Sequence, residues 1–332
     1  MKIKKITFVI PTKNRTNYLK RLIVRGEKIF KKLNYEYFIV DASNNYFHTK
    51  NLKIVKKFKK AKIIRQKSKG IQIGCFESIP SIKTKYVVFL YDDDQLSNFI
   101  FKIYKSNIEE EKTFSFGYGV VKDIKSKIFF KNLNENLINK NDALLGYFGE
   151  DINKNEVFKK SAEKILLPLS PICTTYTLSF LKKWKKTVQS FVYKNSFRNF
   201  FLLKKEVGPD LLIYLMSIYN SKKIVKLYTP CSAKFSSHEN SISIIYGSNF
   251  LRIGYWLSKI CFFYVIKSQK NNLSNKIYTY LITFGLFLLL RNIFNFFYFK
   301  NILIEIIKLN KASKNKFLFF YSIKLLFNRI IR

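Results

Sequence analysis

Two hydrophobic patterns alternate along the first hundred residues. Short apolar runs typical of buried strands lie at 6–10, 37–40, 61–64 and 86–91. Between these runs, apolar residues recur at helical spacing over three stretches, 19–33, 52–58 and 70–81. Repeated strand–helix–strand units predict an α/β fold with a mostly parallel sheet, right-handed crossovers and flanking helices.

The pattern becomes less regular between residues 100 and 245. Apolar stretches predict strands over 114–121, 225–227 and 232–235, and a helix that follows Glu206–Asp210. After about residue 248 the pattern is mostly helical, with many aromatic and basic residues. No Pro- or Gly-rich linker separates these parts, so the boundaries between them are gradual.

Polar clusters follow three of the predicted strands. They are Pro11–Arg15, Asp41–Asn44 and Asp92–Asp94. Ligands of parallel sheets bind beyond the carboxyl ends of the strands. Three polar clusters at one edge therefore favour a nucleotide-binding site over three unrelated loops.

The run Asp92-Asp93-Asp94 stands out against the charge of the chain, which has 61 Lys+Arg and only 21 Asp+Glu. Adjacent carboxylates repel one another unless a cation lies between them. Oxygen ligands at alternate positions, as in Asp92 and Asp94, suit Mg²⁺ or Mn²⁺. The alternative is a solvated acidic turn after a strand.

A formal net charge of +40 has two explanations. One is an anionic partner, such as a membrane surface or a nucleic acid. The other is a compositional bias, because Lys, Asn, Ile, Phe and Tyr are abundant while Ala, Gly and Pro are scarce. Hydrophobic content of 48% excludes a largely disordered chain.

Four cysteines without a CxxC pair give no basis for a zinc site, and we expect them to be reduced.

Neither end of the chain predicts a membrane span. The apolar run at 6–10 is too short for a signal peptide and predicts a strand instead. Residues 277–290 are uncharged, but these fourteen residues fall short of the roughly 18–20 that span a bilayer. An interfacial or buried helix is therefore expected there.

Three segments together carry a family resemblance. The strand ends Ile10–Arg15 and Val40–Asp41, and the apolar strand that runs into Asp92–Asp94, occur in an order that resembles family 2 nucleotide-sugar glycosyltransferases of GT-A fold. The resemblance covers residues 1–100 well and 200–245 more weakly. It implies a GT-A, Rossmann-like, mostly parallel sheet flanked by helices. The expected parts are a nucleotide-sugar-binding half at 1–100, an acceptor-binding half at 101–245 and a basic helical C-terminal extension at 246–332.

The resemblance also implies roles for single residues. Those expected to lie around the nucleotide are Pro11, Thr12, Arg15, Asp41, Lys69, Asp92 and Asp93. Asp41 would contact a uracil-like base and Asp92 would approach the ribose, so a UDP-linked sugar is the expected donor. Asp94, with Asp92, would hold Mn²⁺ or Mg²⁺ and so neutralise charge on the leaving nucleoside diphosphate. His238 is a further candidate metal ligand, and the alternative is an ordinary loop histidine.

The resemblance implies a catalytic base at a helix start well after the Asp92–Asp94 run, for which Asp210 is the candidate and Glu206 the second candidate. A carboxylate at this point would take the proton from the acceptor hydroxyl as that oxygen attacks the anomeric carbon. The alternative is ordinary helix-start chemistry, because Pro209 followed by an acid is a common first turn. The chain also lacks the Glu-Asp pair that is commoner in the family at this point.

Four further residues have weaker claims to a role in the site. His48 is expected to be a surface residue. Tyr176 has two interpretations, which are stacking on an acceptor sugar and packing in the core. The same two interpretations apply to Trp184 and Trp256.

Residues 250–332 combine aromatic and aliphatic residues with scattered Lys and Arg. One interpretation is a set of helices at a membrane interface, with cationic residues that reach anionic head groups. The other is a helical cap that packs on the catalytic domain, and the two are compatible. A lipid-linked acceptor would suit a cytoplasmic enzyme held peripherally at the inner face of the cytoplasmic membrane.

The expected function is metal-dependent transfer of a sugar from a nucleotide donor to a saccharide or lipid-linked saccharide, as in surface polysaccharide assembly. The family 2 resemblance implies that this transfer inverts the anomeric carbon. Two alternatives stay open. A basic nucleic-acid-binding protein would account for the lysines and aromatic residues, although no nucleic-acid module is recognisable. A nucleotidyl or phosphoryl transferase on a related fold would use the same Asp92 and Asp94 with Mg²⁺.

Overall fold

The computed structural model covers the whole chain. The residues that it describes are 6–68, 70–93, 95–96, 100, 104–105, 113–116, 119–121, 136–137, 141, 144–145, 148, 174–221, 223–226, 233–235, 245–267, 272–313 and 316–330. The chain divides into two compact units. One contains residues 1–140, 166–186 and 217–244, and the other contains 141–165, 187–216 and 245–332.

A five-stranded sheet forms the centre of the first unit, with strand order β3-β2-β1-β4-β9. Its strands are β1 (Ile6–Thr12), β2 (Tyr35–Asp41), β3 (Ala61–Arg65), β4 (Tyr86–Phe89) and β9 (Tyr176–Thr177). Strands β1 to β4 pair in parallel, whereas β9 is antiparallel to β4. The mostly parallel sheet predicted from the sequence is therefore confirmed.

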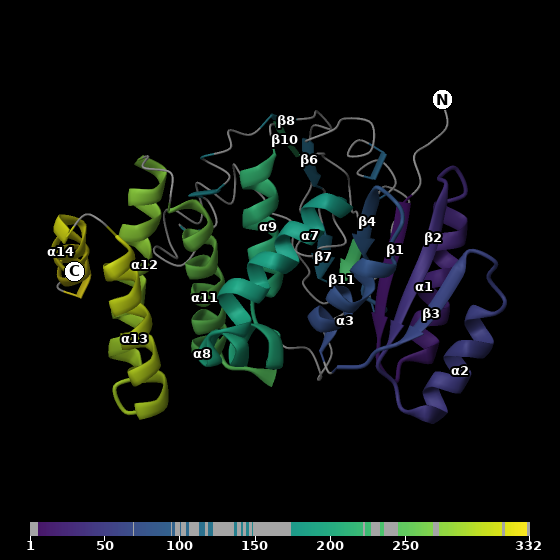
Figure 1. Ribbon diagram of the computed structural model, residues 1–332, viewed down its shortest axis with the longest axis horizontal. Helices are drawn as coiled ribbons and strands as arrows, with labels where there is room; N and C mark the ends of the chain where they lie inside the picture. Colours follow the sequence, from purple (N-terminus) through teal and green to yellow (C-terminus); the bar gives the residue numbers. More distant parts are fainter. Residues whose placement is uncertain are drawn as a thin grey trace. The chain divides into compact units, whose positions relative to one another are not determined.

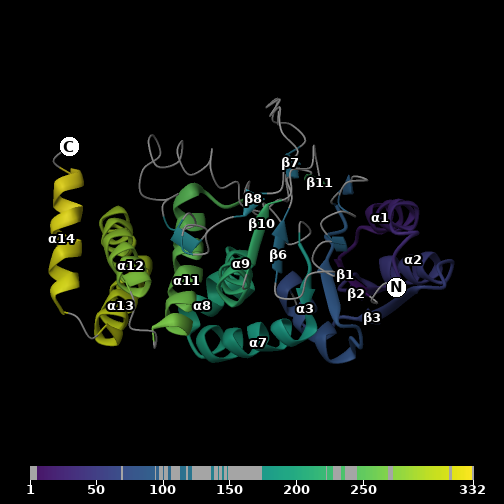
Figure 2. The same ribbon diagram turned by 90° about the horizontal axis from the view of Figure 1, so that it is seen from above.

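Helices cover both faces of this sheet. They are α1 (Thr16–Ile29), α2 (Asn45–Val55), α3 (Ile71–Ser78) and α7 (Leu178–Val188), and a 3-10 turn, η1 (Ile79–Ser81), follows α3. Figure 2 shows α1 and α2 on one face and α3 and α7 on the other. This is the arrangement that right-handed crossovers produce when the strand order reverses between β1 and β4.

One predicted helix start in this unit differs clearly from the structure. Helix α2 begins at Asn45, well before the predicted start at residue 52, because Asn44 caps it with an Oδ1 that accepts from the Phe47 N–H at 3.1 Å. The helix predicted over 70–81 is observed as α3, which ends at Ser78 just before Pro80, and the 3-10 turn that follows, since Pro80 cannot continue the ladder of hydrogen bonds.

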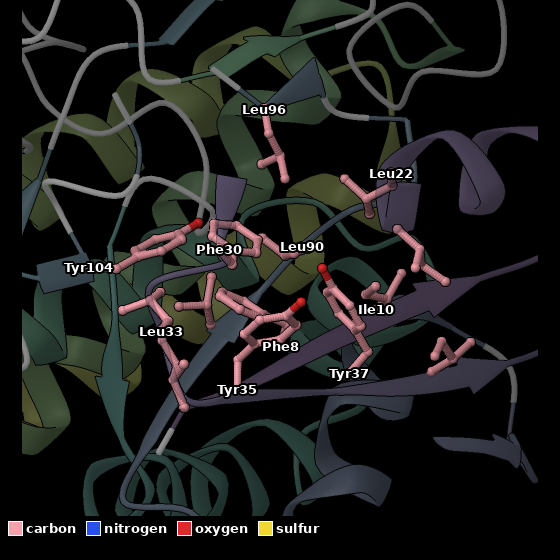
Figure 3. Close-up of a cluster of buried hydrophobic side chains, with 14 of the residues drawn as sticks. Phe8, Ile10, Leu22, Phe30, Leu33, Tyr35, Tyr37, Leu90, Leu96 and Tyr104 are labelled. Carbon is pink, nitrogen blue, oxygen red and sulfur yellow. The ribbon is translucent and has the colours of Figure 1, made fainter. Parts of the chain in front are cut away.

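The core beneath α1 is rich in aromatic rings (Figure 3). Phe8 on β1 stacks on Phe30 at 4.3 Å between ring centroids, and Tyr35 and Tyr104 pack around them. All residues of β1 are buried. Burial of one such side chain contributes about 1.5–3 kcal/mol, so this cluster holds β1 and α1 together. It thereby fixes the loop between them, at residues 13–15.

Two small sheets complete the first unit. One joins β6 (Thr113–Phe116), β10 (Lys223–Lys226) and β8 (Asn136–Leu137), and the other joins β5 (Gln95–Leu96), β11 (Ala233–Phe235) and β7 (Gly119–Val121). The single strand predicted over 114–121 is therefore two strands in different sheets. The strands predicted near 225 and 233 are confirmed as β10 and β11.

The second unit is helical. Its elements are α8 (Ser196–Asn199), α9 (Pro209–Asn220, through Met216), α11 (Ser248–Ile266), α12 (Asn272–Arg291), α13 (Phe296–Ala312) and α14 (Lys316–Ile330), with π-helical turns at Gln189–Tyr193 and Phe200–Lys204. Helix α12 packs against both α13 and α14, and Figure 1 shows the three side by side. The helical C-terminal region predicted from the sequence is confirmed.

The two tryptophans and Tyr176 are core residues. Trp184 and Trp256 are buried, and the Trp256 Nε1–H donates to the Leu281 carbonyl at 2.9 Å. Tyr176 is buried in β9 and stacks on Phe180. The core interpretation of these three residues is confirmed. Cys75 and Cys261 are buried and are not joined in a disulfide, and Cys173 and Cys231 lie outside the described residues.

Helix α12 is longer than the uncharged stretch 277–290 predicted. Residues 273–291 are long and apolar enough to cross a membrane by length and composition, and no second helix in the described part of the chain meets this test. The 14-residue estimate was too short because the polar residues before Ile277 continue the helix. More than half of its most apolar window is buried, as in the core helix of a protein in water.

Candidate functional site

The carboxyl ends of β1 and β4 bring Thr12 and Asp92 together. The two strands are parallel neighbours, so residues that follow them lie at the same edge of the sheet. The Thr12 hydroxyl donates to Asp92 Oδ2 at 2.6 Å, and both residues are buried. The predicted convergence of two of the polar clusters is therefore observed.

Arg15, at the start of α1, contacts both Asp92 and Asp93. Its Nη1 donates to Asp92 Oδ1 at 3.2 Å and to Asp93 Oδ2 at 2.7 Å. One guanidinium thus offsets the repulsion between two adjacent carboxylates. Arg21, nearly two turns further along α1, donates to the Asp93 carbonyl at 3.3 Å and so contacts the backbone beside the same carboxylates.

Burial dominates the protonation of Asp92 and raises its pKa to about 6, although the Thr12 hydrogen bond and the Arg15 charge work in the opposite direction. For Arg15, burial works to lower the pKa, but the charges of Asp92 and Asp93 outweigh it and the pKa is raised. Asp92 therefore changes charge near neutral pH, while Arg15 stays cationic.

Asp41 ends β2 beside Thr12 and is completely buried. Its carboxylate accepts from the Ser43 N–H at 2.8 Å and from Asn51 Nδ2 at 3.0 Å, and it lies 2.7 Å from His48 Nδ1. Burial works to raise the pKa of Asp41, but the hydrogen bonds from Ser43, His48 and Asn51 hold the pKa below its ordinary value. Asp41 is therefore an ionised anchor for the loop that follows β2.

His48 corrects one prediction. It was expected to be a surface residue, yet its ring is only 23% exposed and contacts Asp41. The cause is the early start of α2, which places His48 one turn into the helix, on the side that faces the end of β2. Sequence reasoning also missed Asn51, one turn further on, where helical spacing from His48 was the available signal.

The loops after β1 and β2 are tied to each other by Asn14. Its backbone is left-handed, with φ of 56°, a conformation that Asn tolerates better than most residues. The Asn14 N–H donates to Ser43 Oγ at 2.7 Å, and Asn14 Oδ1 accepts from the Asn44 N–H at 2.9 Å. The two loops thus form one rigid rim beside Thr12.

A third loop, at 66–70, joins the same edge. The Gln66 N–H donates to the Asp41 carbonyl at 2.9 Å, and Gln66 Nε2 donates to the Gly70 carbonyl at 2.6 Å. The carboxylate of Glu77 on α3 accepts from the N–H groups of Lys67 and Ser68 at 2.9 and 3.0 Å. This loop is therefore held from both sides. Lys69, the residue predicted within it, lies outside the described residues.

Asp210 lies in the first turn of α9, in the second unit. Its Oδ1 accepts from the Leu211 N–H at 3.0 Å. Burial raises the pKa of Asp210, and the hydrogen bond from Leu211 works in the opposite direction. A carboxylate with a raised pKa is a better proton acceptor than one in water, which suits a general base.

The turn before Asp210 is strained and is held by α11. Glu206 has φ of 57° and Gly208 has φ of 90°, so the chain passes twice through the left-handed region. Ser258 Oγ donates to the Gly208 carbonyl at 2.6 Å. A Cβ at Gly254 would lie 2.3 Å from Val207 Cγ1, so only glycine permits this approach. Helix α11 therefore fixes the start of α9, where both predicted base candidates stand.

A metal site is not assembled among the residues that the structure describes, where no group of three or more His, Cys, Asp or Glu gathers. Both oxygens of Asp92 accept from Thr12 or Arg15, and a divalent cation at Asp92 would meet the charge of Arg15. The donor set of Asp92 as described thus suits hydrogen-bond donors better than a metal. Asp94 and His238, the other predicted ligands, lie outside the described residues.

Comparison with known families identifies one match. The family described as Glycosyl transferase family 2 matches residues 7–188, more than half of the chain and the part that contains Thr12, Arg15, Asp41 and Asp92. A search among curated proteins found no match.

Solved structures show where the fold recurs. S. aureus TarS 1-349 in complex with UDP-GlcNAc has 16% identity and a TM-score of 0.55, and the match covers 84% of this chain and 71% of that one. A longer S. aureus TarS structure has 14% identity and a TM-score of 0.52, over 84% of this chain and 43% of that one. This chain thus spans less than half of the longer TarS chain. At these identities the likeness shows a shared fold.

Proposed function

This chain belongs to glycosyl transferase family 2 and is a glycosyltransferase of GT-A fold, and we propose that it transfers a sugar from a UDP-linked donor to a saccharide or lipid-linked saccharide. The observation that carries the proposal is the cluster of Thr12, Arg15, Asp92 and Asp93 at the carboxyl edge of the sheet. It lies within the matched residues, and a protein of the same fold was crystallised with UDP-GlcNAc. Family membership does not favour nucleic-acid binding or nucleotidyl transfer as the main activity.

The donor would bind along the rim formed by residues 12–15, 41–44 and 66–70. At pH 7 Asp92, with a pKa of about 6, is mostly ionised and can accept a hydrogen bond from a ribose hydroxyl. Pro11, Thr12 and Asp41 position this rim through β1 and β2, and direct contact of Asp41 with the base stays a prediction. Arg15 would balance part of the negative charge that a diphosphate brings.

The transfer step is proposed as a single displacement. The acceptor oxygen forms a bond to the anomeric carbon while the bond from that carbon to the diphosphate oxygen breaks, and its electron pair leaves with the nucleoside diphosphate. Asp210, with Glu206 as the second candidate, takes the acceptor proton. Attack from the side opposite the leaving group inverts the anomeric carbon.

Divalent metal is part of this proposal. Mn²⁺ or Mg²⁺, held by Asp94 with His238 as a further candidate ligand, would neutralise charge on the departing diphosphate. Asp92 contributes to such a site only if Arg15 gives up its contact, because the two positive charges would otherwise compete.

The test is titration calorimetry of the purified protein with UDP, GDP and CDP, with and without Mn²⁺. We expect UDP to bind, and we expect Asp94→Ala to abolish the contribution of Mn²⁺. The matched variant is Asp210→Asn, which should bind UDP as the wild type does but lose about 10²–10⁴-fold in transfer rate. Absence of nucleotide binding under every condition would refute the donor site, and full transfer by Asp210→Asn would refute its role as the base.

We also propose surface polysaccharide assembly as the setting, with a cytoplasmic location at the inner face of the cytoplasmic membrane. The support is the net charge of +40, which favours an anionic surface, and the usefulness of membrane proximity for a lipid-linked acceptor.

A further inference from the structure

The charge of the C-terminal region is almost entirely of one sign. Residues 240–332 contain fourteen Lys and Arg and a single acid, Glu305. The formal net charge of this region is therefore +13, and the location of Glu305 decides only whether an acid stands among its exposed cations.

Glu305, on α13, is buried. Its Oε2 accepts from Arg198 Nε at 3.1 Å, and its Oε1 accepts from Asn195 Nδ2 at 2.6 Å. The one carboxylate of this region is thus paired internally with an arginine from outside it, and Lys308 Nζ lies 3.6 Å from Glu305 Oε1. Every charged side chain that residues 240–332 can present to solvent is consequently a cation.

Exposed apolar side chains gather where α12 turns into α13, at residues 290–297, which we call the 290–297 turn. Their exposed fractions are 50% for Leu290, 57% for Ile293, 102% for Phe294, 77% for Phe296 and 52% for Phe297. Two exposed cations, Arg291 and Lys300, flank these side chains.

In this turn a polar side chain is buried and apolar side chains are exposed, which is the reverse of an ordinary surface turn. Asn292 is buried, donates to the Leu288 carbonyl at 2.7 Å and accepts from Asn249 Nδ2 at 2.8 Å. Asn295 caps α13 by accepting from the Tyr298 N–H at 3.1 Å. Asn292 thus bonds inward and Asn295 fixes the start of α13 at the surface, while Ile293, Phe294 and Phe296 are exposed.

We propose that the 290–297 turn inserts into the interface of a bilayer that contains anionic lipids. Ile293, Phe294 and Phe296 would enter the boundary between head groups and acyl chains, and Arg291 and Lys300 would contact the head groups. A lipid surface accounts for both features of the turn, since it offers an apolar layer beneath a layer of negative charge. This inference rests on the proposed peripheral location at the membrane. It identifies residues 290–297 as the segment that would attach the protein to the bilayer.

The chain provides a matched control. Phe317 and Phe320 in α14 are also exposed aromatic residues, at 75% and 68%. They follow the opposite end of α13, a helix of 17 residues and thus about 25 Å long. If the turn inserts end-on, these two side chains stay outside the bilayer.

The experiment is co-sedimentation of the full chain with vesicles of phosphatidylcholine, with and without phosphatidylglycerol. We expect binding to the anionic vesicles, a loss on the order of tenfold or more in Phe294→Ser/Phe296→Ser, and little change in Phe317→Ser/Phe320→Ser. UDP binding by each variant serves as the check of folding. A Phe294→Trp variant should show a blue shift of its emission when anionic vesicles are added.

Each other outcome refutes the proposal in a distinct way. Equal binding by the wild type and Phe294→Ser/Phe296→Ser excludes this turn as the docking segment but leaves the peripheral location intact. Equal losses in both double variants mean that the helices lie flat on the membrane instead. No vesicle binding by the wild type excludes the location as well, without affecting the donor site. If, in addition, Phe294→Ser/Phe296→Ser converts an oligomer to a monomer, the turn is an interface between copies.

Discussion

Asp92 differs in its protonation from an aspartate in water. A buried carboxylate beside Thr12 and Arg15 has its pKa raised to about 6, because burial outweighs the hydrogen bond and the nearby positive charge. The folded state therefore holds a proton on Asp92 at pH values where the unfolded chain has released it. This coupling links the donor site to the stability of the whole chain.

The sign of this linkage gives a prediction. Because the folded pKa is above the ordinary value of 3.8, the stabilisation is full below about pH 4 and is lost as the pH rises through about 6. Relative to Asp92→Asn, the wild type should lose on the order of 3 kcal/mol of unfolding free energy between these limits. Urea denaturation of both proteins across this range measures it. A constant difference between the two proteins would mean that Asp92 titrates as in water.

The affinity for UDP should change with pH in the opposite direction to the unfolding free energy. UDP binding that uses ionised Asp92 should weaken below about pH 6, as the carboxylate takes up a proton. Calorimetric titrations at several pH values would show this, and Asp92→Asn should bind more weakly with no inflection near pH 6. An inflection that persists in Asp92→Asn would assign the effect to another group.

At the scale of elements, α11 determines how α9 begins. The hydrogen bond from Ser258 to Gly208 and the close approach of Gly254 to Val207 hold a turn that passes twice through left-handed backbone. A helix from residues 248–266, outside the range matched to the family, thus supports the candidate base Asp210.

Two glycines of the 247–254 segment provide a matched test of this support. A side chain at Gly254 would meet Val207 at 2.3 Å, whereas a Cβ at Gly247 meets nothing within 4 Å. Gly254→Ser should lower the unfolding free energy by about 1–3 kcal/mol and reduce transfer, because the start of α9 must shift. Gly247→Ser should be close to neutral, since serine is favoured at a helix N-cap. Urea denaturation and transfer assays of both variants test this, and equal behaviour would contradict the role of α11.

Elements with a strong local signal were predictable from the sequence, and those defined by distant contacts were not. The strands at 6–10, 37–40 and 61–64 are β1, β2 and β3, because a run of buried apolar residues between polar loops has few other solutions. The start of α2 was missed because its first turns are polar and only the Asn44 cap marks them. The segment 114–121 divides between two sheets, since its partners lie about a hundred residues away.

In the candidate site, too, some features were predictable from the sequence and others depend on distant contacts. Thr12, Arg15, Asp41, Asp92 and Asp93 were placed at one edge because parallel strands end together. The contact of Arg15 with Asp92 and Asp93, across more than 75 residues of sequence, depends on how α1 packs and was not predictable. Gln66 carries no sequence signal of its own, because its role is to connect loops, whereas Asn14 lies within the Pro11–Arg15 cluster and Asn51 is marked only by its helical spacing from His48.

At the scale of the whole molecule, charge is the dominant property. The chain carries a net charge of +40, and in residues 240–332 the one acid is buried against Arg198. Long-range attraction to an anionic surface is screened by salt over about 10 Å at 0.1 M ionic strength. Attraction through hydrophobic insertion is not screened in this way.

This difference predicts how membrane binding responds to salt. If the 290–297 turn docks as proposed, added salt should weaken binding of the full chain to anionic vesicles by about tenfold, with residual binding from the aromatic side chains. Arg291→Gln should bind more weakly at low salt and differ less from the wild type at high salt. Co-sedimentation over a salt series measures both effects, and binding that does not change with salt would contradict a role for the cations.

The burial of Glu305 also determines what can act as a release signal. Residues 240–332 contain no histidine and no exposed side-chain carboxylate, so little in this region changes charge between about pH 5 and 9. Attachment through this region would therefore be insensitive to acidity and responsive to ionic strength, whereas occupancy of the donor site would change with pH through Asp92. The two functions of one chain would then be under independent control, each by a different property of the surrounding solution.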